Sequence, residues 1–438
     1  MNFSKYNIFS KIKDSDNYFI VNLLSGNADI LEESEASKIK AITENHDYSS
    51  ELAKELIDKG YVIDEKTEQI IYKNKYLDFI DNRETDEIQI FFVPNYSCNF
   101  ACSYCYQDEY NNADAIYGND VIDAFFNYIT KEFLNRKKYI TIFGGEPLLG
   151  SDKQKNTIKY LIQKATALNI DLSFVTNGYT LVDYIDILKF AKIREIQVTL
   201  DGTEKIHNSR RFLKGKKETF SKIVKGIDLC INNNITINLR AIIDKENINN
   251  LPELAKFAKE KGWTKNPYFK TQIGRNYELH HCQSSPDKLF SRVSLYENIY
   301  KLVKENPEIL EFYKPSFSIS KFLWENNELP DPLFDSCPAC KTEWAFDYKG
   351  NIYSCTATVG KRDELLGTFY PEITLNQKLV NEWASRDVTE ISECKSCNLQ
   401  LACGGGCASI SKNKTGKVCS PDCRPIKELL EFGFAQYF

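Results

Sequence analysis

Strands and helices alternate along the middle of this chain. We predict six strands, at 87–93, 139–143, 171–176, 195–200, 236–243 and 268–273, with helical stretches between them. About six such units favour a parallel sheet with helices outside it, either open or curved into a barrel. Chemistry in folds of this kind takes place at the C-terminal ends of the strands. The loops that follow the strands are therefore the first place to look for a site.

Four of these loops carry a motif. In chain order they hold Cys98-x3-Cys102-x2-Cys105, Gly144-Gly145-Glu146-Pro147, Thr176-Asn177-Gly178 and Asp201-Gly202. A glycine-containing motif is weak evidence alone, because turns often have such a composition. The common position of all four at the ends of successive strands is stronger evidence. It predicts one site at that edge of the sheet.

The overall composition excludes several classes of protein. The 438 residues include 56 basic and 61 acidic side chains, a formal net charge of −5, and no basic stripe, so we expect no nucleic-acid binding. No apolar run approaches the length of a transmembrane helix, and the first residues lack the charged-then-apolar layout of a signal peptide. We therefore expect a cytoplasmic protein with no membrane contact, in which thiols stay reduced.

The 14 cysteines are clustered along the chain. Three lie near residue 100, nine lie between Cys337 and Cys423, and only Cys230 and Cys282 stand apart. In a reducing compartment this pattern indicates metal ligands rather than disulfides. Cys230 lies on an apolar helical stretch and is expected in the core. The stretch His280-His281-Cys282 is expected to be an ordinary loop, because adjacent histidines point apart in regular structure.

The cysteine triplet points to an iron–sulfur cluster with an open position. A cubane 4Fe–4S cluster normally takes four thiolates, so a compact loop that supplies three leaves one iron without a protein ligand. An open position is what a catalytic metal site needs. The C-x3-C-x2-C spacing, with Tyr104 in the last gap, resembles that of the radical S-adenosylmethionine (radical SAM) superfamily. The resemblance implies that the open iron chelates the amino and carboxylate groups of SAM, and that the strands form a partial (β/α)6 barrel of the TIM type.

The same resemblance assigns further residues to SAM binding. The loop 144–147 would contact the methionine amino group, with Glu146 polarising it. The next motif resembles the family pattern D-G-x4-H-D-x2-R and ends at Arg211, except that Asn208 stands where aspartate is usual. Arg211 would pair with the SAM carboxylate, a contact that suits a guanidinium. Ser173 would contact the ribose, and no catalytic residue is assigned.

The cysteines after residue 336 fit a second pattern. Cys340 is followed by nine residues, Gly350, four residues and Cys355, and then come Cys394-x2-Cys397-x5-Cys403-x3-Cys407 and Cys419-x3-Cys423. This resembles the SPASM domain, which implies two auxiliary 4Fe–4S clusters and three clusters in the whole chain. The alternative is a structural zinc ribbon, which also uses C-x2-C pairs. Nine thiols suit two clusters better than one or two zinc ions.

The resemblance also implies how these thiols divide. The first auxiliary cluster would use Cys337, Cys340, Cys355 and Cys407, and the second would use Cys394, Cys397, Cys403 and Cys423. Eight ligands leave Cys419 over, and the sequence does not decide between Cys419 and Cys423 as the last ligand. Cys337 could instead be free, which would leave the first auxiliary cluster open to substrate.

Residues 1–85 are expected to form a separate small α+β domain. Strands are predicted at 18–23, 28–31 and 61–63, with helices at 32–42 and 49–59. This order resembles the winged-helix element that binds the leader of a ribosomally synthesised and post-translationally modified peptide (RiPP) as an added edge strand. The alternative is a cap that only shields the next domain. The remaining chain divides into a radical SAM core at 86–285, a helical linker at 286–335 and the SPASM domain at 336–438.

The resemblance implies an enzyme that uses a 5′-deoxyadenosyl radical to take a hydrogen atom from a ribosomally made precursor peptide. The product would be an oxidative crosslink, either a thioether or a carbon–carbon bond, and a flavodoxin- or ferredoxin-type protein would donate electrons. An anaerobic sulfatase-maturating enzyme is the first alternative. It has a proton-accepting aspartate after the cysteine that matches Cys355, where this chain has Thr356, and it lacks the N-terminal domain. A non-enzymatic iron–sulfur electron-transfer protein is the second alternative.

Overall fold

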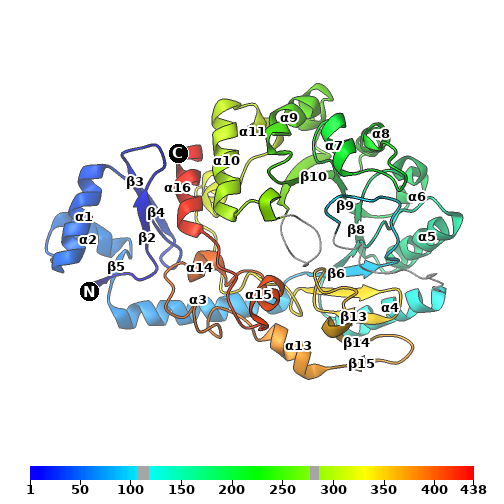
Figure 1. The fold of residues 1–438 in the computed structure, drawn as a ribbon. Helices are drawn as coiled ribbons and strands as arrows, with labels where there is room; N and C mark the ends of the chain where they lie inside the picture. The colour runs from blue at the N-terminus through cyan, green and yellow to red at the C-terminus, as the bar shows by residue number, and fades with distance from the viewer. Residues whose placement is uncertain (106–117, 277–285) are drawn as a thin grey trace.

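A single ten-stranded sheet forms the frame of the molecule. The computed structural model describes residues 1–105, 118–276 and 286–438, so His280-His281-Cys282 lies outside the described residues. The strand order in the sheet is β11-β10-β9-β8-β7-β6-β12-β13-β14-β15. Figure 1 shows the N-terminal elements on the left and the parallel part of this sheet on the right.

Six parallel strands make up the first part of the sheet. They are β6 (Ile88–Val93), β7 (Lys138–Ile142), β8 (Asp171–Thr176), β9 (Ile193–Thr199), β10 (Ile237–Ile243) and β11 (Phe269–Arg275). Each is parallel to its neighbour. The six strands predicted from the sequence are confirmed, with ends that differ by at most two residues. The α/β class with a parallel sheet is therefore confirmed as well.

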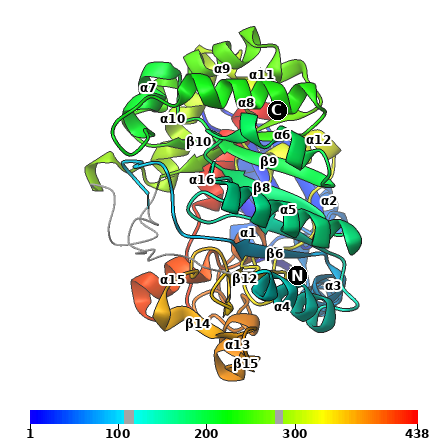
Figure 2. The same cartoon turned by 90° about the vertical axis from the view of Figure 1, so that its right-hand side faces the viewer.

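Alternating side chains divide each strand between a core face and a cavity face. In β10 the core face consists of Ile237, Leu239, Ala241 and Ile243, which are buried. The other face carries Arg240 and Ile242, which line an internal cavity. The core side is covered by α4 (Asn119–Glu132), α5 (Asp152–Ala167), α6 (Ile185–Leu188), α8 (Phe220–Asn232) and α9 (Leu251–Glu260), and Figure 2 shows α5, α6 and α8 in front of the strands. Cys230 of α8 is fully buried in this core, as predicted.

The six strands curve around one cavity. Every strand contributes to its lining, in sheet order through Lys270, Arg240, Gln197, Ser173, Tyr139 and Gln89. A flat sheet could not direct one face of all six strands at the same space. This is the arrangement expected of a partial (β/α)6 barrel.

The C-terminal part continues the same sheet. β12 (Glu343–Asp347) pairs in parallel with β6, and β13 (Asn351–Tyr353), β14 (Leu365–Thr368) and β15 (Thr374–Leu375) follow as antiparallel strands. The cysteine-rich region is therefore joined to the barrel through backbone hydrogen bonds. It also contains the short helices α13 (Gln377–Ala384), α14 (Gln400–Cys403) and α15 (Ala408–Thr415).

The N-terminal part has the predicted hairpin and helices, with additions. β3 (Tyr18–Asn22) and β4 (Asn27–Leu31) form the hairpin, and α1 (Glu33–Asn45), α2 (Glu51–Asp58) and β5 (Val62–Ile63) follow in the predicted order. Three elements were not predicted from the sequence. They are β1 (Asn2–Phe3), β2 (Ile8–Lys11) and the long helix α3 (Glu65–Thr85). β1 pairs with β5, and β2 pairs with β3.

Residues 1–85 have a small core of their own, around Ile20, Ile39 and Tyr61, and they also share a second core with the C-terminal part of the chain. The ring of Phe19 stacks on that of Phe434 with centroids 4.5 Å apart. Phe334 packs against three aromatic residues of α3, which are Tyr72, Tyr76 and Phe79. One buried cluster thus contains side chains from both ends of the chain. The physical reason is α3, whose aromatic side chains are covered by the cysteine-rich region.

Three α-helices of the described chain lie between the barrel and the cysteine-rich region. They are α10 (Arg292–Glu305), α11 (Ile309–Phe312) and α12 (Ser320–Asn326). Both α10 and α12 pack on the C-terminal helix α16 (Ile426–Tyr437). Among the residues that the structure describes, no helix combines the length and the apolar composition needed to cross a membrane.

Candidate functional site

The cavity inside the six strands brings the predicted motifs together. Its volume is about 640 Å³. The lining includes the three thiols of the loop after β6 and four of the six residues expected to bind SAM, namely Cys98, Cys102, Cys105, Gly144, Gly145, Ser173 and Arg211. Thr176 and Asn177 of the third motif also line it. The loops at successive strand ends therefore form one site, as their positions predicted.

The segment that leads to Arg211 holds the cysteine loop in place. Ala101 N donates a hydrogen bond to Phe212 O at 2.9 Å, and Ser103 N donates to Arg210 O at 3.1 Å. A further β-bridge joins Phe100 to Leu213. These contacts are between backbones, so they fix the thiols relative to Arg211 regardless of side-chain motion.

The three thiols of this loop are partly exposed to the cavity. Burial, the carboxylate of Glu146 and the neighbouring thiols of Cys102 and Cys105 raise the pKa of Cys98 to about 12. The charged thiolate is thus disfavoured unless a cation compensates it. A metal cluster supplies that charge, so the chemistry of this donor set fits one.

Two glycines set the distance between the second loop and the cysteine loop. A Cβ atom on Gly145 would lie 2.2 Å from Ser97 O and 2.3 Å from Tyr96 O. A Cβ on Gly144, which has a φ of +145°, would lie 2.5 Å from Asn95 O. Only glycine permits this approach. The backbone of the second loop therefore packs directly on the residues that precede Cys98.

Glu146 connects two loops and does not line the cavity. Its side chain is fully buried, and its carboxylate accepts hydrogen bonds from Thr176 Oγ1 at 2.6 Å, from Asn177 N at 2.6 Å and from Leu148 N at 2.8 Å. Pro147 also lies outside the lining. The structure thus shows that Glu146 positions the loops after β7 and β8, while direct contacts of Glu146 and Pro147 with SAM stay predictions.

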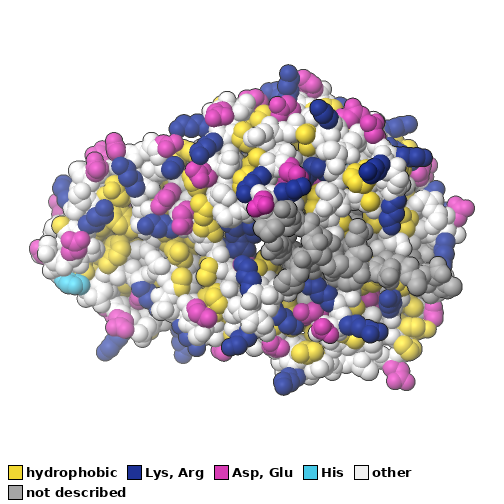
Figure 3. All heavy atoms as spheres, in the orientation of Figure 1, with side chains coloured by type: hydrophobic (Ala, Val, Ile, Leu, Met, Phe, Trp, Pro, Cys, Tyr) yellow, Lys and Arg dark blue, Asp and Glu magenta, His cyan; other side chains and the backbone are white. Residues whose placement is uncertain are grey.

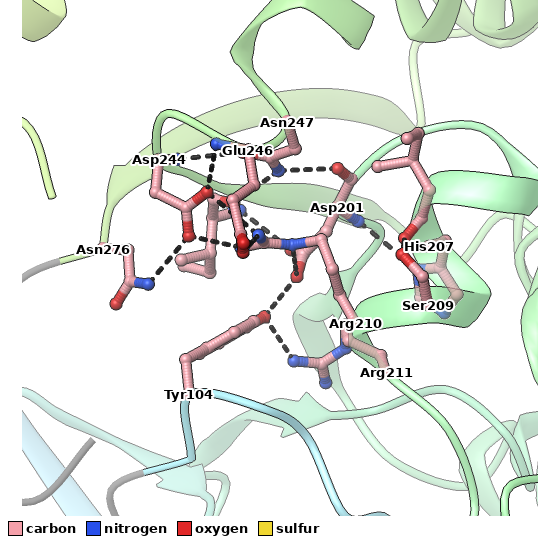
Figure 4. A network of polar contacts seen from close by, with 12 residues as sticks. Tyr104, Asp201, His207, Ser209, Arg210, Arg211, Asp244, Glu246, Asn247 and Asn276 are labelled. Carbon is pink, nitrogen blue, oxygen red and sulfur yellow. Dashed lines mark hydrogen bonds and ion pairs between the residues drawn. The ribbon is translucent and has the colours of Figure 1, made fainter. Parts of the chain in front are cut away.

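A network of buried polar groups positions Arg211 (Figure 4). Tyr104 Oη accepts a hydrogen bond from Arg211 Nη1 at 2.7 Å and donates one to Asp201 Oδ2 at 2.5 Å. Arg210 binds Asp244 through both terminal nitrogens, at 2.9 and 2.8 Å. Arg211 Nε is buried and has no hydrogen-bond partner. The guanidinium is therefore held at one edge and unsatisfied at another, which fits a carboxylate ligand.

The rest of this motif has structural roles. Asn208 Oδ1 accepts hydrogen bonds from Thr219 N and Phe220 N, each at 3.0 Å, at the start of α8. An aspartate could accept the same bonds, which explains why either residue suits this position. His207 is fully buried and accepts from Asp201 N through Nδ1 at 3.3 Å. The sequence patterns did not indicate the roles of Tyr104 and Arg210, because their partners are distant in the sequence. Asp201 lies 97 residues from Tyr104, and Asp244 lies 34 residues from Arg210.

One group of C-terminal thiols surrounds Cys394. Burial and the nearby thiols of Cys403, Cys397 and Cys423 raise the pKa of Cys394 to about 12. Arg386, which is fully buried, holds the loops that carry these cysteines. Its guanidinium donates to the carbonyl oxygens of Gly405 at 2.7 Å, Val418 at 2.9 Å, Ser420 at 2.9 Å and Gly406 at 3.2 Å. No local pattern in the sequence indicates this role of Arg386.

A second group surrounds Cys337. Burial raises the pKa of Cys355, and the thiols of Cys337 and Cys407 add to the effect. Burial likewise raises the pKa of Cys340, with Cys337 nearby. These neighbours agree with the grouping that the resemblance implied, and the two ligand sets themselves stay predictions.

Cys419 stands outside both groups. Cys419 is exposed. Partial burial of its thiol and the carboxylates of Glu390 and Asp387 raise its pKa, whereas Arg386 lowers it. Cys423, by contrast, is influenced by Cys403 and Cys397 after burial. The structure thus distinguishes two exposed cysteines that the sequence left as alternatives.

The described residues contain no converged site for a single metal ion. Within residues 1–105, 118–276 and 286–438, no three Cys, His, Asp or Glu side chains converge on a position for one ion. A zinc ribbon needs such convergence, with ligands at about 2.0–2.3 Å from one ion. The thiolates of a cubane lie further apart because each binds a different iron.

Comparison with protein families identifies the central part of the chain. Residues 92–258 match the Radical SAM superfamily. The chain therefore has a radical SAM domain, as the motifs predicted. The match includes the three thiols of the cysteine loop, the loop 144–147 and Arg211.

Similar proteins include one curated relative and two solved structures. The cysteine-type anaerobic sulfatase-maturating enzyme of Clostridium novyi (strain NT) is 24% identical over 330 residues, which cover 71% of this chain and 85% of that enzyme. The structure of native anSMEcpe with bound AdoMet matches with a TM-score of 0.61 at 18% identity, covering 80% of this chain and 98% of that one. Streptococcus suis SuiB bound to precursor peptide SuiA matches with a TM-score of 0.54 at 15% identity, covering 96% and 98%.

These structural matches establish a shared fold. The 4% of this chain that the SuiB match leaves out is shorter than residues 1–85. The fold of SuiB therefore extends over part of the N-terminal region. The match to anSMEcpe leaves out a fifth of the chain.

Proposed function

We propose that this chain, which has a radical SAM domain, is a RiPP maturase that joins two residues of a precursor peptide through a thioether or a carbon–carbon bond. The observation that carries the proposal is the meeting of three thiols, the backbone of Gly144 and Gly145, and the unsatisfied guanidinium of Arg211 on one cavity. When bound, the clusters and SAM supply one-electron chemistry, which comprises cleavage of SAM to a 5′-deoxyadenosyl radical and removal of an electron from the peptide.

The protein's part at this site is to hold and orient. Cys98, Cys102 and Cys105 would bind the first 4Fe–4S cluster and leave one iron for SAM. Arg211 would bind the SAM carboxylate through the edge of its guanidinium that Tyr104 does not occupy. Ser173, which lines the cavity on β8, would contact the ribose. The six strands of the curved sheet line this space on one side.

The C-terminal thiols would bind two auxiliary clusters. Cys337, Cys340, Cys355 and Cys407 would hold the first, and Cys394, Cys397, Cys403 and Cys423 the second. The first group lies nearer the cavity, because Thr356, which follows Cys355, is part of its lining. A flavodoxin- or ferredoxin-type protein would donate the electrons.

The N-terminal region would bind the leader of the precursor peptide. In the three-stranded sheet, β4 pairs with β3 on one side only, so its other edge can accept an added strand. Ile30 on this edge strand is 42% exposed, and Figure 3 shows hydrophobic side chains over the N-terminal elements. The match to SuiB, whose structure was solved with precursor peptide SuiA, supports this role.

Sulfatase maturation is the second candidate, and the identity to the Clostridium novyi enzyme favours it. The aspartate that such enzymes place after the cysteine matching Cys355 is Thr356 here, and its position in the cavity lining is where a base would act. A threonine hydroxyl does not accept a proton at neutral pH. This difference, together with the N-terminal region, supports the RiPP maturase.

The proposal is tested with anaerobically reconstituted, reduced, full-length protein. We expect 5′-deoxyadenosine above the level of a Cys98→Ala control, and loss of two hydrogen masses from a short peptide encoded beside the gene. Conversion of a sulfatase peptide to formylglycine, with no change in the encoded peptide, would establish the second candidate. Absence of 5′-deoxyadenosine with every peptide would reject both and leave electron transfer.

The leader-binding role needs a point substitution. Deletion of residues 1–85 would uncover Phe334 and Phe434, which this region buries. Ile30→Lys places a charge on the edge strand, and we expect leader affinity to fall several-fold. The matched control is Ile70→Lys, on an exposed position of α3. Equal leader affinity in the two variants would reject binding at this edge.

A further inference from the structure

The cavity contains a second guanidinium that the proposed SAM contacts do not use. Arg240 lies on the cavity face of β10 and lines the same space as the three thiols. Its Nε is buried without a hydrogen-bond partner. Within the described part of the chain, its side chain forms no ion pair or hydrogen bond. Two incompletely bonded arginines, Arg211 and Arg240, therefore face one cavity.

Two other cations of the cavity lining, Arg194 and Lys270, are paired with carboxylates of the protein. Arg194 binds both carboxylate oxygens of Glu87 at 2.6 Å and also pairs with Asp171 at 2.9 Å. Lys270 pairs with Glu195. Among the residues that the structure describes, no carboxylate forms an ion pair with Arg240.

The surroundings of Arg240 are built to hold a guanidinium. A Cβ atom on Gly274 of β11 would lie 2.9 Å from Arg240 Nε and 3.0 Å from Nη2, so the absence of a side chain there provides the space. The residues paired with Arg240 in the neighbouring strands are Thr199 and Gln272, and both are uncharged. Thr199 also lines the cavity. The paired positions on the neighbouring strands thus offer room and polar groups, and neither of them carries a negative charge.

An uncompensated cation in such a position is costly unless a ligand supplies an anion. A carboxylate fits best, since a guanidinium binds it through two parallel hydrogen bonds. SAM has one carboxylate, and Arg211 is assigned to it. We propose that Arg240 binds a carboxylate of the peptide substrate, which is an aspartate or glutamate side chain or the C-terminus, close to the residue that reacts. This inference rests on the proposed function, because it places the peptide in the same cavity.

The test measures binding and needs no turnover. The probes are alanine hexapeptides with aspartate, asparagine or lysine at the centre and with a free or amidated C-terminus, added to oxygen-free, SAM-saturated, full-length protein. We expect the wild type to bind the aspartate peptide, or the free-terminus peptide, about tenfold more tightly than its uncharged counterpart. The two comparisons distinguish a side-chain carboxylate from a terminal one. Absence of both preferences would overturn the proposal.

Variants then assign the preference to Arg240. We expect Arg240→Gln to remove the preference for carboxylate-bearing peptides and Arg240→Glu to replace it with a preference for the lysine peptide. Arg240→Lys should keep part of the preference for the carboxylate. Gly274→Ala, which displaces the guanidinium without removing it, should weaken the preference as well. The matched control is Arg362→Gln, an exposed arginine, which should retain the full preference. A preference that survives in Arg240→Gln would overturn the proposal.

A second arm excludes SAM as the source of the carboxylate. SAM and decarboxylated SAM are compared by equilibrium dialysis, and Arg211→Gln should abolish the discrimination between them while Arg240→Gln retains it. Loss of discrimination in Arg240→Gln would assign Arg240 to SAM and overturn the peptide assignment. The proposed function is tested by a different measurement and fails if reduced wild-type protein forms no 5′-deoxyadenosine. The peptide preference is measured without reduction, so the two failures can be told apart.

Discussion

The chain carries thiols in two regions, and the two regions are built differently. The loop after β6 supplies three thiols that are partly exposed and line the cavity. The C-terminal region supplies nine thiols, eight of which we propose as two groups of four ligands, and most of these eight are buried. From that region Thr356 reaches the cavity lining, and none of its cysteines does. An incomplete ligand set beside a cavity suits chemistry, whereas complete sets away from the cavity suit electron transfer.

The largest expected effect separates these two roles. Cys98→Ala removes one of three ligands from a set that has no spare, so we expect 5′-deoxyadenosine formation to fall below detection. Cys394→Ala removes a ligand from a complete set away from the cavity, so SAM cleavage should persist while peptide modification is lost. Both products are quantified by liquid chromatography with mass spectrometry. Persistent SAM cleavage in Cys98→Ala would remove the distinction between the regions.

The second expected effect concerns the stability of the C-terminal region. Arg386→Met leaves the carbonyl oxygens of Gly405, Val418 and Ser420 without their buried donor. We expect a loss of about 3 kcal/mol or more in the free energy of unfolding, because breaking a buried charged network leaves groups unsatisfied. Urea unfolding of oxygen-free protein measures it. Lys378→Met on the exposed face of α13 is the control, and an equal midpoint in the two variants would contradict the role of Arg386.

The third expected effect is on SAM affinity. Arg211→Gln removes the charged partner of the SAM carboxylate, and we expect affinity to fall about tenfold to a hundredfold. Tyr104→Phe removes only the hydroxyl that positions the guanidinium, so the fall should be smaller, about threefold to tenfold. Equilibrium dialysis measures both. The reverse order of the two effects would show that Tyr104, and not Arg211, is the main contact.

The smallest expected effect compares two exposed cysteines. Cys423 lies with Cys394, Cys397 and Cys403, whereas Cys419 lies outside both groups. We expect about twelve iron atoms per wild-type chain, about eight in Cys423→Ser and about twelve in Cys419→Ser. Iron and sulfide analysis of reconstituted protein gives these values. A loss in Cys419→Ser without one in Cys423→Ser would exchange the two assignments.

Local patterns made much of this architecture predictable. The strands were found because their apolar alternation and the motifs at their ends are local features. The hydrogen bond from Tyr104 to Asp201 joins residues 97 positions apart in the sequence, and no local pattern indicates it. The same is true of Arg386, whose partners are backbone carbonyls.

The shared core of the two chain ends could have been suspected. Tyr72, Tyr76 and Phe79 of α3 have the spacing i, i+4, i+7, which predicts an aromatic stripe on one helix face. The stripe shows that the helix is covered, but the covering residue, Phe334, follows 255 positions later. Glu146 illustrates the opposite limit. The motif around Glu146 marks the correct loop. Only the structure shows that its carboxylate accepts hydrogen bonds from Thr176 and Asn177.

The central claim is that the loop after β6 holds a cluster with one iron free to bind SAM. Electron paramagnetic resonance of reduced, oxygen-free, full-length protein, recorded with and without SAM, tests it most directly. The account predicts that SAM changes the signal of one cluster, and that Cys98→Ala loses this signal while the remaining ones persist. A spectrum that SAM leaves unchanged, or a SAM-sensitive signal that survives in Cys98→Ala, would contradict it.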